Sequence, residues 1–375
     1  MSARRSLTAH RCALFAAIVT VVRSRVRGPC DWCPLLVLHN GLMRYVIVGA
    51  GAIGATIGGL LADAGREVVL VARGDHLLAL KTEGLRLTLP ERLIHLRLPA
   101  VAVDELELRD DDVLVLTVKS QQSEAVLTQL AALPVGQHSA GEALPVLCAQ
   151  NGISNEDTAL RFFAGVHGVC VNLPATHLEP GLVEAQGMPF SGVLQVGRFP
   201  RGVDTIDVSV VADLCASGFV ATAAEDVMAW KRAKLLRNVG NALEVLCAGH
   251  LEKQDPQDPA DSLVRVIDGA TQEARACFAA AGWSVVTDRD YSAVLGDQAR
   301  PVPVGGHPRQ GGSTWQSVQR GQGSVETDFL NGEIVRLGRL HQIPTPLNST
   351  IQLRMRTCHP NHFQTQSLDP IELLG

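Results

Sequence analysis

The sequence predicts an α/β fold in its N-terminal part, followed by an all-helical C-terminal domain. Three observations support this prediction. A strand pattern, a glycine-rich turn and a small-residue helix follow one another in residues 44–65. Short β-branched runs then alternate with helical patterns up to residue 197, and after residue 224 the apolar spacing becomes that of long helices. A chain of 375 residues is long enough for two or three domains.

The glycine-rich turn has the G-x-G-x-x-G spacing of a dinucleotide-binding site, with a strand pattern before it and a helix pattern after it. Gly49 permits the tight turn, Gly51 lets a pyrophosphate approach the backbone, and Gly54 lets the helix pack closely on the strand. The N–H groups at the helix start favour a phosphate there. The alternative, a glycine-rich turn without a ligand, fits these flanks less well. The sequence therefore predicts a Rossmann-type domain with the cofactor-binding residues Gly49, Ala50, Gly51, Ala52, Ile53 and Gly54.

Three later strand patterns each end in a polar residue. Residues 67–71 lead to Arg73, residues 112–118 lead to Lys119, and residues 145–149 lead to Asn151. Ligands of open α/β sheets bind beyond the carboxyl ends of the strands. We therefore expect Arg73, Lys119 and Asn151 to face one crevice. Residues 85–89 and 94–98 predict a hairpin, and residues 166–173 and 191–197 predict strands that extend the sheet.

The domain boundaries follow from these patterns. We expect residues 1–42 to be an N-terminal extension outside the fold, and we favour translation from Met43 over a signal peptide or an organelle presequence. The Rossmann-type domain is expected at 43–224 and the helical domain at 225–352. Long helices are predicted at 226–246, 260–281 and 324–341, and a loose tail at 353–375.

Composition excludes several classes of partner. The net charge of −5 and the 4% aromatic content argue against nucleic acid, and no apolar run is long enough for a membrane helix. The nine cysteines are scattered, as expected of reduced thiols in a cytoplasmic protein. Cys30 and Cys33 form an isolated C-x-x-C, which we do not interpret as a metal site.

The residue after the second strand predicts the cofactor. An acid there binds the ribose 2′-hydroxyl of NAD, whereas an arginine accommodates the 2′-phosphate of NADP. Arg73 occupies this place, so we predict NADP(H), although Asp75 lies nearby. The alternative is that Arg73 is a solvated surface side chain.

The helical domain contains two clusters that could carry chemistry. Lys234, Asn238 and Asn241 lie close to one stripe of a predicted helix that is otherwise apolar. A lysine near a cleft suits a general acid, but Lys234 and Lys231 could equally line a solvated face. The second cluster comprises Ser313, Thr314 and Glu326. From spacing alone, Glu326 is expected to be an acid in the first turn of a helix, where such residues are common.

Taken together, these motifs resemble the ketopantoate reductases (2-dehydropantoate 2-reductases). The resemblance rests on the glycine fingerprint, Arg73, Val118-Lys119-Ser120, Gln150-Asn151-Gly152 and the two helical clusters, which occur in this order over residues 43–352. It implies NADPH-dependent reduction of 2-dehydropantoate to (R)-pantoate, in pantothenate and coenzyme A biosynthesis. It further implies a small-molecule 2-keto acid as substrate and helical-domain contacts that could form a homodimer. The alternatives are a reductase of another branched 2-keto or 3-hydroxy acid and an NADP(H)-binding protein without turnover.

The resemblance also implies roles for particular residues. Lys234 matches the general acid, and Glu326 matches the carboxylate that holds the substrate hydroxyl. The residues that match substrate-binding positions are Asn238, Asn241, Ser313, Thr314 and Asn151, and those that line the nicotinamide are Lys119 and Asn151. Two departures concern the substrate side. Asn241 follows Asn238 by three positions where well-known members have four, and the loop 301–312 is longer than usual.

Overall fold

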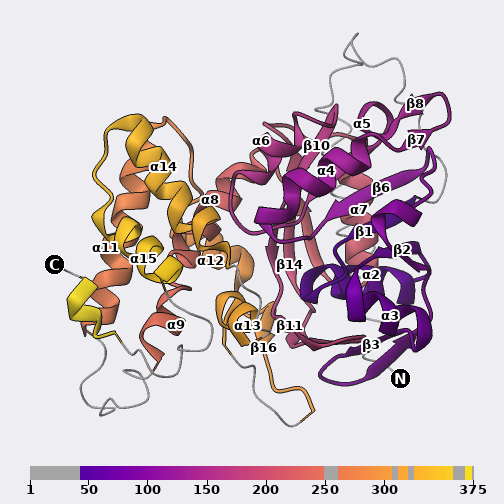
Figure 1. Ribbon diagram of the computed structural model, residues 1–375, viewed down its shortest axis with the longest axis horizontal. Coiled ribbons are helices and arrows are strands. Elements are labelled where there is room, and N and C mark those ends of the chain that lie inside the picture. The colour runs from indigo at the N-terminus through magenta and orange to yellow at the C-terminus, as the bar shows by residue number, and fades with distance from the viewer. Residues whose placement is uncertain (1–42, 249–260, 306–310, 320–324, 358–367, 374–375) are drawn as a thin grey trace. The chain divides into compact units, whose positions relative to one another are not determined.

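The computed structural model describes residues 43–248, 261–305, 311–319, 325–357 and 368–373 (Figure 1). The expected N-terminal extension, with Cys30 and Cys33, lies outside the described residues, as does much of the loop 301–312 and of the tail. Contacts divide the chain into residues 1–40 and 41–375, and only the second unit is treated below. The five cysteines in the described part of the chain are unbridged. None of the described helices is long and apolar enough to cross a membrane.

An eight-stranded sheet forms the centre of the α/β part, in the order β15-β14-β10-β9-β6-β1-β2-β5. Its strands are β1 Arg44–Val48, β2 Glu67–Val71, β5 Ala100–Val101, β6 Asp112–Leu116, β9 Pro145–Cys148, β10 Gly165–Asn172, β14 Val193–Arg198 and β15 Val220–Ala223. All neighbours are parallel except β10 and β14, which are antiparallel. The predicted α/β fold is confirmed, and β10 and β14 extend the sheet as expected.

The central strands are apolar on both faces because helices cover both faces. Tyr45 and Ile47 of β1 pack into one core, which includes α2 (Ala52–Asp63) and α7 (Thr205–Ala216). Val46 and Val48 pack into the other core, on the side of α4 (Ser123–Ala131). The shorter helices of this part are α3 Gly74–Thr82, α5 Ala140–Ala143 and α6 Asn155–Ala159. Helix α7 was not predicted from the sequence.

A second, four-stranded sheet packs against α2, in the order β11-β12-β3-β4. The predicted hairpin is confirmed as β3 (Leu85–Thr88) and β4 (Leu93–Leu96). The other two strands, β11 (Ala175–Glu179) and β12 (Leu182–Ala185), were not predicted, and β12 pairs with β3 in parallel. Two small pairs complete the strands, β7 (Pro134–Val135) with β8 (His138–Ser139) and β13 (Gly187–Pro189) with β16 (Ala299–Pro301).

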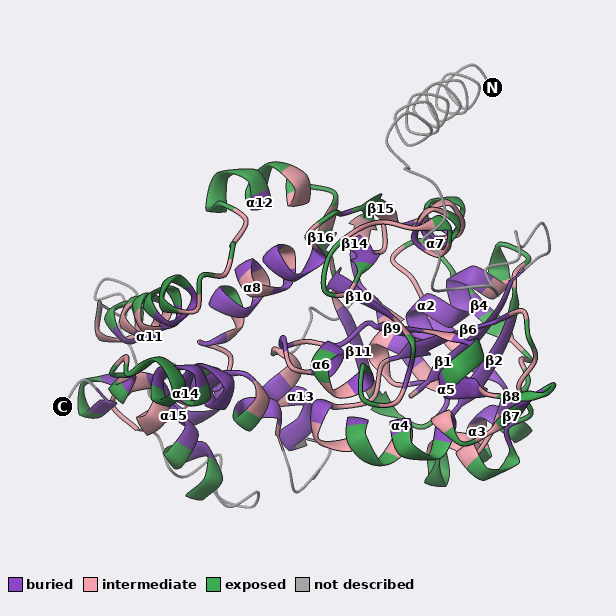
Figure 2. Ribbon diagram, turned by 90° about the horizontal axis from the view of Figure 1, so that it is seen from above, coloured by how far each residue is buried: buried purple, intermediate pink, exposed green. Residues whose placement is uncertain are grey.

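The C-terminal part is helical and has its own apolar core. Its helices are α8 Val227–Asn238, α9 Leu243–Leu246, α11 Asp261–Ala280, α12 Asp288–Leu295, α13 Ser313–Gln319, α14 Asn331–His341 and α15 Pro346–Thr357. Short 3-10 turns lie at η3 Glu326–Phe329 and η5 Pro370–Leu373. Figure 2 shows α8 largely buried, whereas α11 has a long exposed face. Helix α8 packs against β10 and β14, so it connects the helical part to the sheet.

Two predicted helices are interrupted, which corrects the sequence-based prediction. The helix expected at 226–246 ends at Asn238, and a turn separates α8 from α9. The Asn331 side chain donates to the carbonyl of Val239 at 2.9 Å and so satisfies a group that a continuing helix would have used. The helix expected at 324–341 is divided at Leu330, which lies between η3 and α14.

Two elements lie within the described residues of the segment that was expected to be a loose tail. Helix α15 continues to Thr357, and Leu373 of η5 is buried in the helical core.

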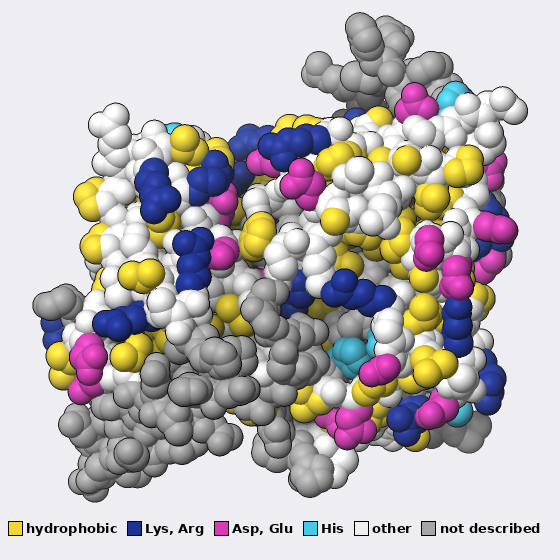
Figure 3. All heavy atoms as spheres, viewed as in Figure 1, with side chains coloured by type: hydrophobic (Ala, Val, Ile, Leu, Met, Phe, Trp, Pro, Cys, Tyr) yellow, Lys and Arg dark blue, Asp and Glu magenta, His cyan; other side chains and the backbone are white. Residues whose placement is uncertain are grey.

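On the face of the molecule shown in Figure 3, Lys and Arg side chains are interspersed with Asp and Glu side chains.

Candidate active site

The glycine turn has the geometry that dinucleotide binding requires. Gly49 has φ of +105°, and a Cβ there would lie 2.8 Å from Val118. A Cβ on Gly54 would lie 2.3 Å from the Gly49 carbonyl oxygen and 2.4 Å from Oγ1 of Thr117, so only glycine allows this approach of helix and strand. A Cβ on Gly51 would meet only Nδ1 of His177, at 4.0 Å. The space over Gly51 and the start of α2 at Ala52 therefore fit a pyrophosphate.

The carboxyl ends of the central strands are level with one another. Val48 of β1 pairs with Val71 of β2 and with Leu116 of β6, and Leu116 pairs with Cys148 of β9. The residues that follow these strands consequently lie along one edge of the sheet, as the sequence predicted. Arg73 is exposed at the start of α3. The N–H groups of Gly49 and Ala50 both donate to the Val71 carbonyl, which places the glycine turn beside the β2 end that leads to Arg73.

A histidine that the sequence analysis did not consider supports the glycine turn. Nε2 of His76 lies 2.6 Å from the Ala50 carbonyl oxygen, and its Nδ1 accepts a hydrogen bond from the Gly181 N–H at 3.0 Å. This pattern defines a neutral ring protonated at Nε2. Burial lowers the pKa of His76, which the hydrogen bond to Ala50 opposes. The His177 ring, on β11, lies 4.3 Å from the His76 ring.

Lys234 of α8 reaches the edge of the sheet. Its ammonium donates to Oδ1 of Asn151 at 2.7 Å and to the backbone carbonyl of Val171 on β10. Lys231, one turn earlier, points elsewhere and forms a buried ion pair with Glu156 of α6, while its ammonium donates to the Cys148 carbonyl at 3.2 Å. Burial raises the pKa of Glu156 despite this lysine. The alternative in which both lysines line a solvated face is wrong, because both are engaged with the sheet part.

Glu326 of η3 is held from the carboxyl end of β6. Its carboxylate accepts from the Lys119 ammonium at 2.6 Å and from the N–H and the hydroxyl of Ser120, both at 3.1 Å. Burial by itself raises the pKa of Glu326, but the charge and hydrogen bond of Lys119 and the bonds from Ser120 outweigh burial, so the pKa lies below its ordinary value. Glu326 therefore contacts another part of the chain and does more than occupy a first helical turn.

Further buried polar residues connect these groups, and sequence reasoning assigned them no role. The Asn155 amide donates to Ser120 Oγ at 3.2 Å and to the Asn151 carbonyl at 3.0 Å, and its oxygen accepts from Ser123 Oγ at 2.9 Å. The Gln150 amide donates to Ser123 Oγ at 2.8 Å. The sequence offers one signal of this network. Asn151 and Asn155 are four positions apart, a spacing that brings two residues together in a helical turn.

The other predicted substrate residues lie in the helical part. Asn238 is the last residue of α8, and Asn241 lies in the turn that follows. Ser313 and Thr314 begin α13, a helix that packs against β11 and α9, and Thr314 is buried. Their contact with a substrate stays a prediction.

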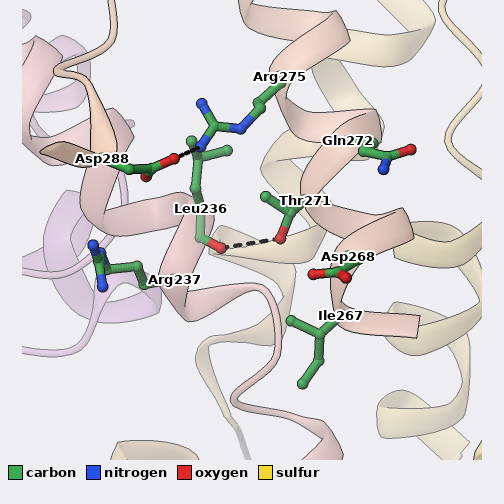
Figure 4. A pocket seen from close by; sticks show the side chains of 8 residues that line it. All are labelled: Leu236, Arg237, Ile267, Asp268, Thr271, Gln272, Arg275 and Asp288. Atoms are coloured by element: carbon green, nitrogen blue, oxygen red, sulfur yellow. Dashed lines mark hydrogen bonds and ion pairs between the residues drawn. The ribbon is translucent and has the colours of Figure 1, made fainter. Parts of the chain in front are cut away.

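A surface groove of about 440 Å³ lies away from these residues, between α8, α11 and α12 (Figure 4). Three of its charged side chains make other contacts, since Arg275 is paired with Asp288 at 2.6 Å and Arg237 lies over the Tyr291 ring at 4.6 Å. None of the predicted catalytic, substrate or cofactor residues lines this groove.

The fold defines the class of protein, a Rossmann-type α/β protein with a glycine turn at the carboxyl edge of its sheet and a helical second part. Comparison with known proteins then specifies the family. The family model described as ketopantoate reductase PanE/ApbA matches residues 45–201, and the model of its C-terminal part matches residues 226–357. The chain belongs to the ketopantoate reductase family, which confirms the resemblance seen in its motifs.

Individual relatives agree with this assignment. A 2-dehydropantoate 2-reductase of Pyrococcus horikoshii is 27% identical over 315 residues, covering 82% of this chain and 94% of the relative. A 2-dehydropantoate 2-reductase of Halobacterium salinarum is 29% identical over 325 residues, covering 82% and 96%. The crystal structure of a PanE/ApbA family ketopantoate reductase from Ralstonia eutropha is 27% identical, with a TM-score of 0.68 and coverage of 86% of this chain and 100% of that one.

Proposed function

We propose that the protein reduces 2-dehydropantoate to (R)-pantoate with NADPH, in pantothenate and coenzyme A biosynthesis. One observation carries this proposal. The Lys234 ammonium and the Glu326 carboxylate both reach the carboxyl edge of the sheet, Lys234 through Asn151 and Glu326 through Lys119. The same edge includes the glycine turn, where folds of this kind bind a dinucleotide.

The residues around the turn fit the cofactor. Gly51 and the start of α2 would hold the pyrophosphate, and Lys119 and Asn151 would lie beside the nicotinamide. Arg73, which is exposed beyond β2, would bind the 2′-phosphate with its planar guanidinium. This is the reason to propose NADP(H) over NAD(H).

The chemistry assigned to this chain is stabilisation and protonation of an oxygen. A nicotinamide cofactor bound at the glycine turn would supply the hydride that reduces the C2 carbonyl of the keto acid. As negative charge develops on the carbonyl oxygen, the ammonium of Lys234 stabilises that charge and donates a proton. Asn151 orients Lys234, because its Oδ1 accepts one of the three ammonium N–H groups.

Glu326 is suited to hold a substrate hydroxyl. It accepts three hydrogen bonds, and a carboxylate offers about four acceptor directions, so one remains for a donor on the substrate. Its lowered pKa keeps it ionised and hence an acceptor at neutral pH. Asn238, Asn241, Ser313 and Thr314 are proposed to bind the remaining polar groups of the substrate.

The test is an NADPH-oxidation assay with 2-dehydropantoate against 2-oxoisovalerate, 4-methyl-2-oxopentanoate and related branched keto acids. We expect kcat/KM for 2-dehydropantoate to exceed that for each analogue by at least about tenfold, because only 2-dehydropantoate offers a hydroxyl to Glu326.

The other outcomes are informative. A higher kcat/KM for another keto acid would assign the protein to a different reductase reaction. Tight NADPH binding without oxidation by any compound of the panel would favour a non-catalytic binding protein. A cytoplasmic location and a homodimer are further proposals, which cell fractionation and light scattering of the purified protein would check.

A further inference from the structure

We propose that Asn155 is a positioning residue of this active site, which directs the Ser120 hydroxyl toward Glu326 and holds the backbone of Asn151, the residue that binds Lys234. This inference rests on the proposed function, because it assigns Asn155 a role through the proposed catalytic groups. Asn155 touches neither of them directly in the hydrogen bonds described above.

The orientation of the Asn155 amide is fixed by its partners. Asn155 is 2% exposed, so its polar atoms must find partners within the protein. The hydroxyl of Ser123 accepts a hydrogen bond from Gln150 and donates its proton to Oδ1 of Asn155. Nδ2 of Asn155 then faces Ser120 Oγ at 3.2 Å and the Asn151 carbonyl oxygen at 3.0 Å, both of which accept.

This orientation determines where the Ser120 proton goes. A serine hydroxyl has one proton to donate and lone pairs that accept. Because Ser120 Oγ accepts from Asn155, its proton is directed to Oε1 of Glu326 at 3.1 Å. An acceptor in place of the Asn155 amide nitrogen would attract that proton and turn the Ser120 lone pairs toward the carboxylate.

The same amide supports Lys234 from the other side. Asn155 Nδ2 holds the backbone carbonyl of Asn151, and the side chain of Asn151 accepts from the Lys234 ammonium at 2.7 Å. One buried side chain thus connects the proposed acid, on α8, with the proposed substrate-binding carboxylate, on η3.

The other charges near Glu326 do not replace Ser120. Lys119 faces it from the β6 side, at 2.6 Å. On η3 itself, Asp328 is paired with Arg356 of α15 and accepts from Gln352, and on α14 Glu333 is paired with Arg336. The Ser120 hydroxyl is uncharged, so its proton can be turned away from Glu326 without breaking any of these ion pairs.

The test is a double-mutant cycle of Asn155→Asp and Ser120→Ala. Asn155→Asp keeps the shape of the side chain but replaces the donor by an acceptor. We expect kcat/KM for 2-dehydropantoate to fall at least tenfold at pH 7 while the Kd for NADPH changes less than threefold. The acid limb of the pH profile of kcat/KM should move to higher pH, because Glu326 loses a hydrogen bond that favours its ionised form.

In the Ser120→Ala background, Asn155→Asp should lower kcat/KM by at least threefold less than it does in the wild type, because the Ser120 hydroxyl that it would reorient is absent. Asn155→Ala, which removes the donor without introducing an acceptor, should move the acid limb less than Asn155→Asp does. Additive effects in the cycle, or an unmoved acid limb in Asn155→Asp, would overturn the proposal.

A second measurement needs no substrate: the equilibrium constant of urea-induced unfolding is determined for the same four proteins at pH 4 and pH 7. We expect the effects of Asn155→Asp and Ser120→Ala on that constant to differ from additivity by at least threefold at pH 7 and by less at pH 4. If the two substitutions are coupled in unfolding but no keto acid is reduced, the contact of Asn155 with Ser120 is supported and the proposed function is rejected. If 2-dehydropantoate is reduced but the substitutions are not coupled, the role of Asn155 is rejected and the proposed function remains.

Discussion

The ammonium of Lys234 lies 2.7 Å from the side-chain oxygen of Asn151, although the two residues are 83 positions apart in the chain. Lys234 belongs to the first helix of the helical part, and Asn151 follows a strand of the central sheet. The contact brings a candidate proton donor to the edge of the sheet where the strands end. It is the geometric basis for the first prediction.

Replacing Lys234 by alanine should lower kcat by at least about a hundredfold, because general acid catalysis typically contributes 10²–10⁴-fold. The Kd for NADPH should stay within about threefold of the wild-type value, since the glycine turn is untouched. Steady-state kinetics and NADPH fluorescence titration measure the two quantities. As a control, Arg237→Ala removes an exposed cation of the same helix and should leave kcat unchanged. Equal kcat values for Lys234→Ala and wild type would refute the assignment.

Replacing Arg73 by alanine should reduce kcat/KM for NADPH by at least about tenfold and that for NADH by less than threefold. Only NADPH has the 2′-phosphate, and a hydrogen bond to a charged group contributes about 1.5–3 kcal/mol. The two values are compared in one assay series. Lys81→Ala, at the other end of α3, is the matched loss of a cation and should preserve the preference. If Arg73→Ala lowers kcat/KM equally for NADPH and NADH, Arg73 does not bind the 2′-phosphate.

Two alanine substitutions in the glycine turn should change different properties, Gly54→Ala the stability of the fold and Gly51→Ala the binding of NADPH. Gly54→Ala introduces a Cβ 2.3 Å from the Gly49 carbonyl oxygen, and such overpacking costs about 1–3 kcal/mol or more of unfolding free energy. Gly51→Ala meets only His177, at 4.0 Å, so its stability should stay within about 1 kcal/mol of wild type. Its Kd for NADPH should nevertheless rise at least tenfold, because the Cβ occupies the approach of the pyrophosphate. Urea denaturation and fluorescence titration separate the two effects, and tight NADPH binding by Gly51→Ala would contradict the placement of the cofactor.

The buried His76 ring should make the fold less stable in mild acid. Its pKa in the folded protein is lowered from an ordinary value near 6.5, so the unfolded chain takes up its proton first as the pH falls. The stability is fully present above pH 6.5 and decreases below that value. His76→Gln keeps a donor for Ala50 without a titratable ring, so its Tm should fall less than that of wild type between pH 7.5 and pH 5.

The exposed His138 supplies the control for this measurement. His138→Gln should lose Tm over the same pH range as wild type does. An identical loss in His76→Gln would show that the His76 ring contributes nothing to the acid sensitivity.

The features that could be predicted from the sequence depend on local chemistry. The glycine spacing predicts the turn from local geometry, since Gly49 needs a φ of +105° and Gly54 needs close approach to the Gly49 carbonyl, both within one strand–turn–helix unit. Parallel strands end at a common edge, so the neighbourhood of Lys119 and Asn151 also followed from strand positions.

The features that could not be predicted depend on distant partners. The break after Asn238 involves a cap from Asn331, and the strands β11 and β12 are too short and irregular to stand out without their partner β3. Ser120 and Asn155 look like ordinary polar residues until the fold brings them beside Glu326 and Asn151. For the same reason, spacing alone could not separate Lys234, at the edge of the sheet, from Lys231, buried against Glu156.

The parallel pairing of β3 with β12 has a consequence for the order of folding. Arg86 pairs with Leu182, so the small sheet beside α2 joins two segments that are far apart in the sequence of the α/β part. Such non-local pairing closes late, because a long loop must lose entropy before the pairing is formed. During synthesis, the exposed edge of the β3–β4 hairpin must therefore wait for residues beyond 182 to leave the ribosome, and the nascent chain has an uncovered strand edge in that interval.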